Sequence, residues 1–202
     1  MQIRELKIPD SYEITPKPFG DDRGVFFEWY RSDRLEAVIG HSLSLAQGNQ
    51  SVSRRGVVRG IHFADVPPSQ AKYVTAPRGA VLDFVIDLRV GSPAFGQWDS
   101  VLLDDVDHRA IYIAEGLGHC FVALTEDANV SYLVSAPYNA EREHGINPLD
   151  PAVGLDFPIA SDALLLSPKD TDAPTLAEAE ATGLLPTWEN ARAFYDSLNE
   201  GR

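Results

Sequence analysis

The sequence predicts an all-β fold in which antiparallel strands form a sandwich or a barrel. Short runs rich in β-branched and aromatic residues follow one another along the chain, and such a density of strands is typical of these folds. Turn-forming segments separate the runs, and none is long enough to be an interdomain linker. The expected strands are 25–29, 43–53, 56–63, 72–76, 80–88, 100–103, 110–114, 119–124 and 130–135.

Helical patterns occur in three short segments only. Ser32 has the character of an N-cap, and the helix that it starts should end near Gly40. Segment 175–183 opens with a capping threonine, continues with strong helix formers and ends at a glycine. Segment 187–198 has an amphipathic pattern. We expect these helices to cover an end of the barrel or to form a dimer contact.

The chain has 202 residues, of which 44% are hydrophobic and 23% charged, as in an ordinary globular protein. This length favours a single domain over residues 1–202, with the barrel core at about 40–140 and a C-terminal helical segment at about 174–199. The formal net charge of −13 argues against nucleic acid or an anionic membrane as a partner, because both would be repelled. An anionic substrate therefore needs a local cluster of basic residues.

Cysteine occurs once, at Cys120, so no intrachain disulfide is possible. The N-terminus lacks an apolar leader, and no run of residues approaches the length of a membrane span. We expect a cytoplasmic protein.

One pair of neighbouring strands carries a histidine and two basic residues among apolar neighbours. Arg59, His62 and Lys72 are flanked by Val, Ile, Phe and Tyr, which indicates that they face a cleft. An imidazole beside fixed positive charge suits an anionic substrate and proton transfer. Because the separation of Arg59 and His62 is odd, a straight strand would point them to opposite faces. For both to serve one cleft the strand must bend or bulge, most easily at Gly60.

Two further expectations concern polar residues. On strand 80–88 the alternation puts Asp83 on the face opposite Phe84, where it meets either solvent or a polar barrel interior. No pattern assigns a role to His41, His108 or His144, and we expect these histidines to be exposed.

From about residue 14 to 186 the chain closely resembles the dTDP-4-dehydrorhamnose 3,5-epimerase family of nucleotide-sugar epimerases. Several ordered motifs at compatible spacings carry the resemblance, and together they are far more specific than any one alone. They are residues 22–28, 47–53, 58–63, 70–74, 91–98, 115–121 and 166–170. The resemblance implies a cupin-type antiparallel jelly-roll barrel, a homodimer, and no metal or organic cofactor.

The resemblance also implies the reaction. Family members invert carbons 3 and 5 of dTDP-4-dehydro-6-deoxy-D-glucose to give dTDP-4-dehydro-L-rhamnose, and both carbons flank a ketone, so loss of either proton gives an enolate. By match to the family motifs, His62 is the base, Asp170 its partner, Lys72 the group at the enolate oxygen and Tyr132 the acid on the opposite ring face. These roles need a neutral base, an oxyanion donor and a proton donor.

The same match assigns the residues that hold the dTDP-4-keto-6-deoxyhexose. Tyr138 corresponds to an aromatic that stacks on thymine, and Arg23 to a residue that reaches the site of the other subunit. The remaining expected substrate-binding residues are Glu28, Gln47, Asn49, Arg59, His119, Glu143 and Lys169.

Many cupins hold a metal through an H-x-H pair, a later Glu and a further His. Here His62 is followed by Phe63 and Ala64, so the pair is missing. Glu115 precedes His119 by four residues, but the intervening glycines argue against a helix and give poor ligand geometry. We expect no metal.

Two alternatives stay open on the sequence. A relative that inverts carbon 3 or carbon 5 alone would retain the same acid–base residues, and Gly48, Gly118 and Cys120 depart from the family pattern near the sugar. A non-catalytic sugar-nucleotide-binding cupin would also need the basic pocket, although it would not need an acid–base pair.

Overall fold

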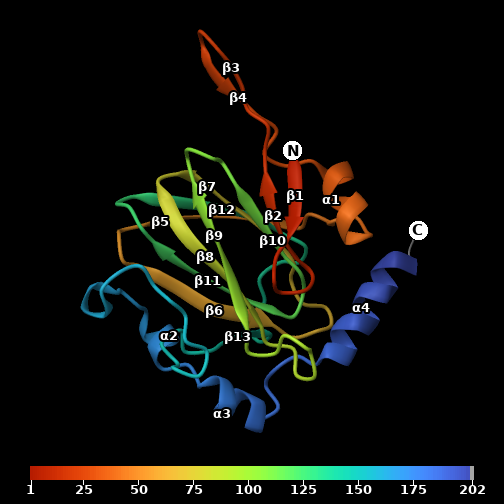
Figure 1. Cartoon of the computed structure of the whole chain (residues 1–202). Helices are drawn as coiled ribbons and strands as arrows, with labels where there is room; N and C mark the ends of the chain where they lie inside the picture. The colour runs from red at the N-terminus through yellow and green to blue at the C-terminus, as the bar shows by residue number, and fades with distance from the viewer. Residues whose placement is uncertain (201–202) are drawn as a thin grey trace.

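The computed structural model describes residues 1–200 and consists of two antiparallel sheets packed face to face (Figure 1). The first sheet contains, in spatial order, β1 (Gln2–Glu5), β2 (Ser11–Thr15), β10 (Ala110–Ile113), β7 (Lys72–Arg78), β12 (Ala128–Val134) and β5 (Gln47–Ser53). The second contains β13 (Glu143–Gly145), β6 (Val58–Ala64), β11 (Leu117–Ala123), β8 (Ala80–Asp87) and β9 (Trp98–Asp104). The expected jelly roll is confirmed, as two separate sheets without closure into one barrel.

Strand β8 shows how alternation builds the two apolar clusters. Val81 and Val85 belong to a large cluster shared with the six-stranded sheet. Phe84 and Ile86 point the other way, into a second cluster covered by residues from the C-terminal third of the chain. Asp83 lies on the side of Val81 and Val85 and is fully buried. It therefore faces the interior, as one of the two expected arrangements had it, and not solvent.

The N-terminal region differs from the sequence prediction. Strands β1 and β2 were not expected because most of their residues are polar; β1 forms the edge of the sheet and β2 lies beside it. The expected strand at 25–29 is wrong beyond Phe26: β3 (Phe19–Asp21) and β4 (Gly24–Phe26) form a separate hairpin that projects from the body (Figure 1). The expected strand at 43–53 begins only at Gln47.

All three expected helices are present. Helix α1 (Ser32–Ile39) ends at Gly40 with φ of 89°, but its N-cap is Arg31, so Ser32 is the first helical residue and not the cap. Helix α3 (Leu176–Ala181) starts with a capping box formed by Thr175 and Glu178, and α4 (Trp188–Glu200) follows. The 3-10 turn η1 (Ser161–Ala163) and the short helix α2 (Pro168–Thr171) were not expected. Within residues 1–200, no helix is long and apolar enough to cross a membrane.

Candidate active site

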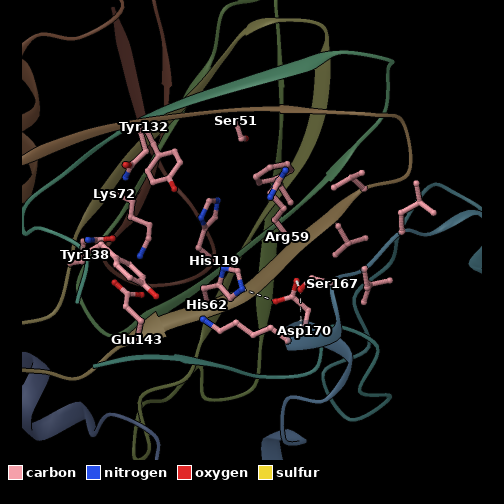
Figure 2. A pocket seen from close by; sticks show the side chains of 18 of the residues that line it. Ser51, Arg59, His62, Lys72, His119, Tyr132, Tyr138, Glu143, Ser167 and Asp170 are labelled. Atoms are coloured by element: carbon pink, nitrogen blue, oxygen red, sulfur yellow. Dashed lines mark hydrogen bonds and ion pairs between the residues drawn. The ribbon is translucent and has the colours of Figure 1, made fainter. Parts of the chain in front are cut away.

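A cavity of about 560 Å³ opens among the strands and collects most of the expected site residues (Figure 2). Its lining comes from both sheets and from α2, so segments far apart in the sequence meet there. The expected residues that line it are Gln47, Asn49, Arg59, His62, Lys72, His119, Tyr132, Tyr138, Glu143, Lys169 and Asp170.

An irregularity in β6 brings Arg59 and His62 to this one cavity. His62 lies opposite His119 of β11 and Arg59 lies opposite Phe121, so three residue steps on β6 match two on β11. The extra residue lies at Gly60, which has a φ of 119°. A Cβ at this position would lie 2.7 Å from Cys120, so only glycine fits. The bulge predicted at this glycine is confirmed.

His62 and Asp170 form a hydrogen-bonded pair, with 2.7 Å between Nε2 and Oδ1. The other carboxylate oxygen, Oδ2, accepts a 2.7 Å bond from the Ser167 hydroxyl, and Ser167 also caps α2. Burial by itself raises the pKa of Asp170, but the bonds from His62 and Ser167 outweigh it and hold this pKa below its usual value. An ionised Asp170 fixes a proton on His62 Nε2 and leaves Nδ1 free to act as a base.

A second imidazole–carboxylate pair lies beside the first. His119 Nε2 is 2.8 Å from Oδ2 and 3.0 Å from Oδ1 of Asp83, which β8 places in the interior. Burial raises the pKa of Asp83 above its usual value, and the interaction with His119 opposes this only in part. The two pairs meet because His62 and His119 are cross-strand neighbours.

Lys72 begins β7 and is only 7% exposed, although it lines the cavity. Burial lowers the pKa of its ammonium group, and the charges of Glu143 and Glu115 act in the opposite direction. Tyr132 comes from the neighbouring strand β12 (Figure 2). Burial and the charge of Glu143 raise the pKa of its phenol, while Arg59 opposes them, so the phenol keeps its proton at neutral pH.

Arg23 and Glu28 do not join the other residues within this chain. Arg23 lies at the projecting β3–β4 hairpin with its side chain 90% exposed and paired with Asp21. Glu28 pairs with Arg31 and lines a different surface pocket. One chain by itself therefore assembles a site without these two side chains.

Sequence reasoning missed several residues that line the cavity. Ser51 continues the alternation of Gln47 and Asn49 along β5, so the period of two could have revealed it. Arg54 follows the same strand and adds a positive charge to the lining. Ser167 could have been recognised as the residue before Pro168, a common start of a helix.

The histidines without an assigned role are less exposed than expected. His41 is buried, at 7% exposure, and lines a small cavity of about 80 Å³ beside α4. His144 is half-buried and bonded to Asp65, and half-buried His108 stacks on Phe27. Among residues 1–200, no three His, Cys, Asp or Glu side chains are grouped so that they could hold a metal ion.

The fold and the cavity together define a class of protein. A jelly roll with a cavity lined by an oriented imidazole, a buried lysine side chain and a protonated phenol is equipped for proton transfer. Such a site is typical of an enzyme that uses acid–base catalysis.

The comparisons with known proteins identify the particular family. The family model of dTDP-4-dehydrorhamnose 3,5-epimerase matches residues 5–178. A dTDP-4-dehydrorhamnose 3,5-epimerase from Mycolicibacterium smegmatis is 56% identical over 98% of this chain and 97% of its own length. A dTDP-4-dehydrorhamnose 3-epimerase from Streptomyces niveus is 54% identical over 96% of this chain and 92% of its own.

A solved structure agrees with the sequence relatives. An epimerase from Mycobacterium tuberculosis superposes with a TM-score of 0.95 at 51% identity, over 98% of this chain and 100% of that one. The chain belongs to the dTDP-4-dehydrorhamnose 3,5-epimerase family, as its motifs predicted, and it is an isomerase.

Proposed function

We propose that this protein inverts carbons 3 and 5 of dTDP-4-dehydro-6-deoxy-D-glucose to give dTDP-4-dehydro-L-rhamnose. The observation that carries the proposal is the lining of one cavity by the His62–Asp170 pair, Lys72 and Tyr132. A protein that merely holds a sugar nucleotide could use the positive charge of Lys72, but it would not need an imidazole base and a phenol acid. Each member of the set has a place in proton abstraction and return.

In the proposed mechanism His62 starts the reaction. Its Nδ1 takes the proton from the carbon beside the ketone, and the bond from Nε2 to Asp170 stabilises the imidazolium that forms. The electron pair of the broken C–H bond moves into the ring, and the ketone becomes an enolate. The ammonium of Lys72 stabilises the enolate oxygen, a contribution of about 3 kcal/mol in a site that excludes water.

Tyr132 completes the inversion from the opposite ring face. Its protonated phenol donates a proton to the carbon, and the enolate returns to the ketone. His62 then releases its proton to solvent and Tyr132 takes one from solvent, which restores the base and the acid. The second carbon can then undergo the same steps. The basic side chains of Arg59 and Lys169 hold the diphosphate, and Tyr138 stacks on the thymine.

The test is product analysis in D₂O with the 4-keto sugar nucleotide, followed by NMR. Deuterium at both carbon 3 and carbon 5, with the L-configured product trapped by a reductase, supports the proposal. Absence of turnover by the purified protein would refute it.

A mono-epimerase is the second candidate, favoured by the 54% identical 3-epimerase. It predicts deuterium at one carbon only in the same experiment. The acid–base residues serve both reactions, so the position of the label separates the two candidates.

We further propose a cytoplasmic homodimer in which Arg23 binds substrate in the site of the partner subunit. Its side chain is 90% exposed on a projecting hairpin, and it is absent from the cavity of its own chain. Phe19, Val25 and Phe26 on the same hairpin are exposed, and a dimer contact would remove them from water.

Subunit complementation tests this arrangement. Arg23→Ala and His62→Asn chains are refolded together, and turnover is measured against each homodimer. If Arg23 acts across the interface, the mixed dimer contains one intact site, and activity reappears. If Arg23 acts within its own chain, neither site of the mixed dimer is intact, and mixing restores nothing.

A further inference from the structure

The sheet register places Glu115 and Ser135 close to Lys72. Lys72 pairs with Ile113 of β10 on one side and with Val134 of β12 on the other. Glu115 follows Ile113 by two residues, and Ser135 follows Val134 by one. The three side chains therefore come to the same end of the six-stranded sheet.

Ser135 links Glu115 to the strand of Lys72 by hydrogen bonds. Its hydroxyl oxygen accepts a 2.8 Å bond from the amide of Ala71, the residue before Lys72. The same hydroxyl donates a 3.2 Å bond to Glu115 Oε1. The carboxylate is thus held at a fixed place relative to the start of β7.

Glu115 is buried and lies outside the cavity lining, and its second oxygen is unpaired. The residue is 3% exposed and does not line the cavity. Within residues 1–200, Oε2 has no hydrogen-bond partner. The charge of His41 also acts on Glu115. Two tyrosines, Tyr112 and Tyr195, lie nearby, and the hydroxyl of Tyr195 donates a hydrogen bond to the backbone carbonyl of Glu115. A buried carboxylate with an unpaired oxygen is costly unless a positive charge compensates it.

Lys72 carries a buried positive charge that needs a compensating negative one. It too is buried, and within residues 1–200 no carboxylate lies within ion-pair distance of its ammonium group. The two carboxylates whose charges reach it are Glu143 of β13 and Glu115. Glu143 is half-buried and lines the cavity, where a substrate can engage it, whereas Glu115 does not line the cavity.

We propose that Glu115 is a positioning residue that keeps the Lys72 ammonium group charged at the cavity. Its effect on turnover rests on the proposed function, because it operates through the charge that Lys72 presents to the enolate oxygen. Its effect on Lys72 itself does not depend on any substrate.

The direct test is NMR titration of the lysine side chains without substrate. The chain has four lysines, Lys7, Lys17, Lys72 and Lys169, so the Cε signal of Lys72 can be assigned with a Lys72→Met variant. In Glu115→Gln, which keeps the shape and loses the charge, the pKa of Lys72 should fall. Glu115→Asp should keep most of the parent value.

A control separates this charge effect from damage to the buried cluster. Tyr112→Phe removes another buried polar group near Glu115, and the Tyr112 hydroxyl has no hydrogen-bond partner in the described part of the chain. It should leave the Lys72 titration unchanged. In kinetics, the alkaline limb of kcat/KM should move to lower pH in Glu115→Gln by the same amount as the Lys72 pKa, while Tyr112→Phe retains the parent profile.

An unchanged Lys72 pKa in folded Glu115→Gln would overturn the inference. If that variant does not fold, the reciprocal measurement decides. In Lys72→Met the Glu115 carboxyl, followed by its ¹³C signal, should titrate at higher pH than in the parent. An unshifted titration would contradict the coupling. A parent protein that shows the Lys72 shift but no epimerase activity would refute the proposed function and leave this inference standing.

Discussion

The two imidazole–carboxylate pairs of the cavity have the same chemistry but different surroundings. In the His62–Asp170 pair the imidazole side chain is 37% exposed, whereas in the His119–Asp83 pair it is 10% exposed. Asp170 is held by a serine at the start of a short helix, and Asp83 lies within a central strand with no exposed surface. The first pair can meet a substrate carbon, while the second is mostly enclosed.

The pKa values of the two carboxyls move in opposite directions. Hydrogen bonds from His62 and Ser167 prevail over burial and lower the pKa of Asp170. Burial prevails over the contact with His119 and raises the pKa of Asp83. Access and hydrogen bonding, rather than the mere presence of a His–Asp pair, therefore distinguish the proposed base from the proposed binding residue.

The largest expected effect is that of His62→Asn on turnover. This change removes the proposed base and should lower kcat by about 10³-fold or more. Steady-state kinetics measures it, and binding of dTDP by calorimetry is the control, since affinity should stay near that of the parent. Turnover within tenfold of the parent would show that the exposed pair is not the base.

Asp170→Asn should have the next largest effect. The amide cannot stabilise the imidazolium and favours the wrong tautomer of His62, so kcat should fall by about 10²-fold with little change in KM. Asp83→Asn, the matched change in the enclosed pair, should lower kcat much less. Equal losses in the two variants would remove the distinction between the pairs.

His119→Asn tests the binding role proposed for the enclosed pair. If His119 only holds the sugar, KM should rise about tenfold while kcat stays within about threefold. The same kinetic assay supplies both numbers. A fall in kcat comparable with that of His62→Asn would assign proton transfer to the enclosed pair as well.

The smallest expected effect is on the pH dependence of the free energy of unfolding. A lowered carboxyl pKa stabilises the fold above the unfolded value of about 3.9, and this contribution is lost as pH falls through the folded pKa. A raised pKa does the reverse, so the stabilising contribution of Asp83 is lost as pH rises above about 4.

Relative to the parent, Asp170→Asn should therefore lower the free energy of unfolding near neutral pH and lower it less in acid. For Asp83→Asn, the free energy of unfolding relative to that of the parent should instead increase as pH rises. Urea unfolding at several pH values measures both differences. Changes of the same sign in the two variants would contradict the opposed pKa directions.

Much of this site follows from local sequence. The strand bearing His62 was placed to within two residues, and the bulge at Gly60 follows from the odd spacing of Arg59 and His62 together with the freedom of glycine. The partnership of His62 with Asp170 spans 108 residues. No periodic pattern connects positions so far apart, and only the resemblance to a family paired them.

Other features depend on packing that the sequence does not display. The pairing of Asp83 with His119 requires knowledge of which face of β8 is interior. His41 was expected to be exposed, but it lines a small cavity with Tyr195 and Asn199, residues of the distant helix α4. Glu115 was weighed only as a metal ligand beside His119, because its approach to Lys72 arises from pairing between strands.

The most direct test of the central claim is the rate at which solvent deuterium enters carbon 3 of the 4-keto sugar nucleotide, measured by NMR for the parent, His62→Asn and His119→Asn. This exchange reports proton abstraction without waiting for product release. We expect rapid exchange in the parent, exchange within about threefold of it in His119→Asn, and a loss of about 10³-fold in His62→Asn. Undiminished exchange in His62→Asn would contradict it.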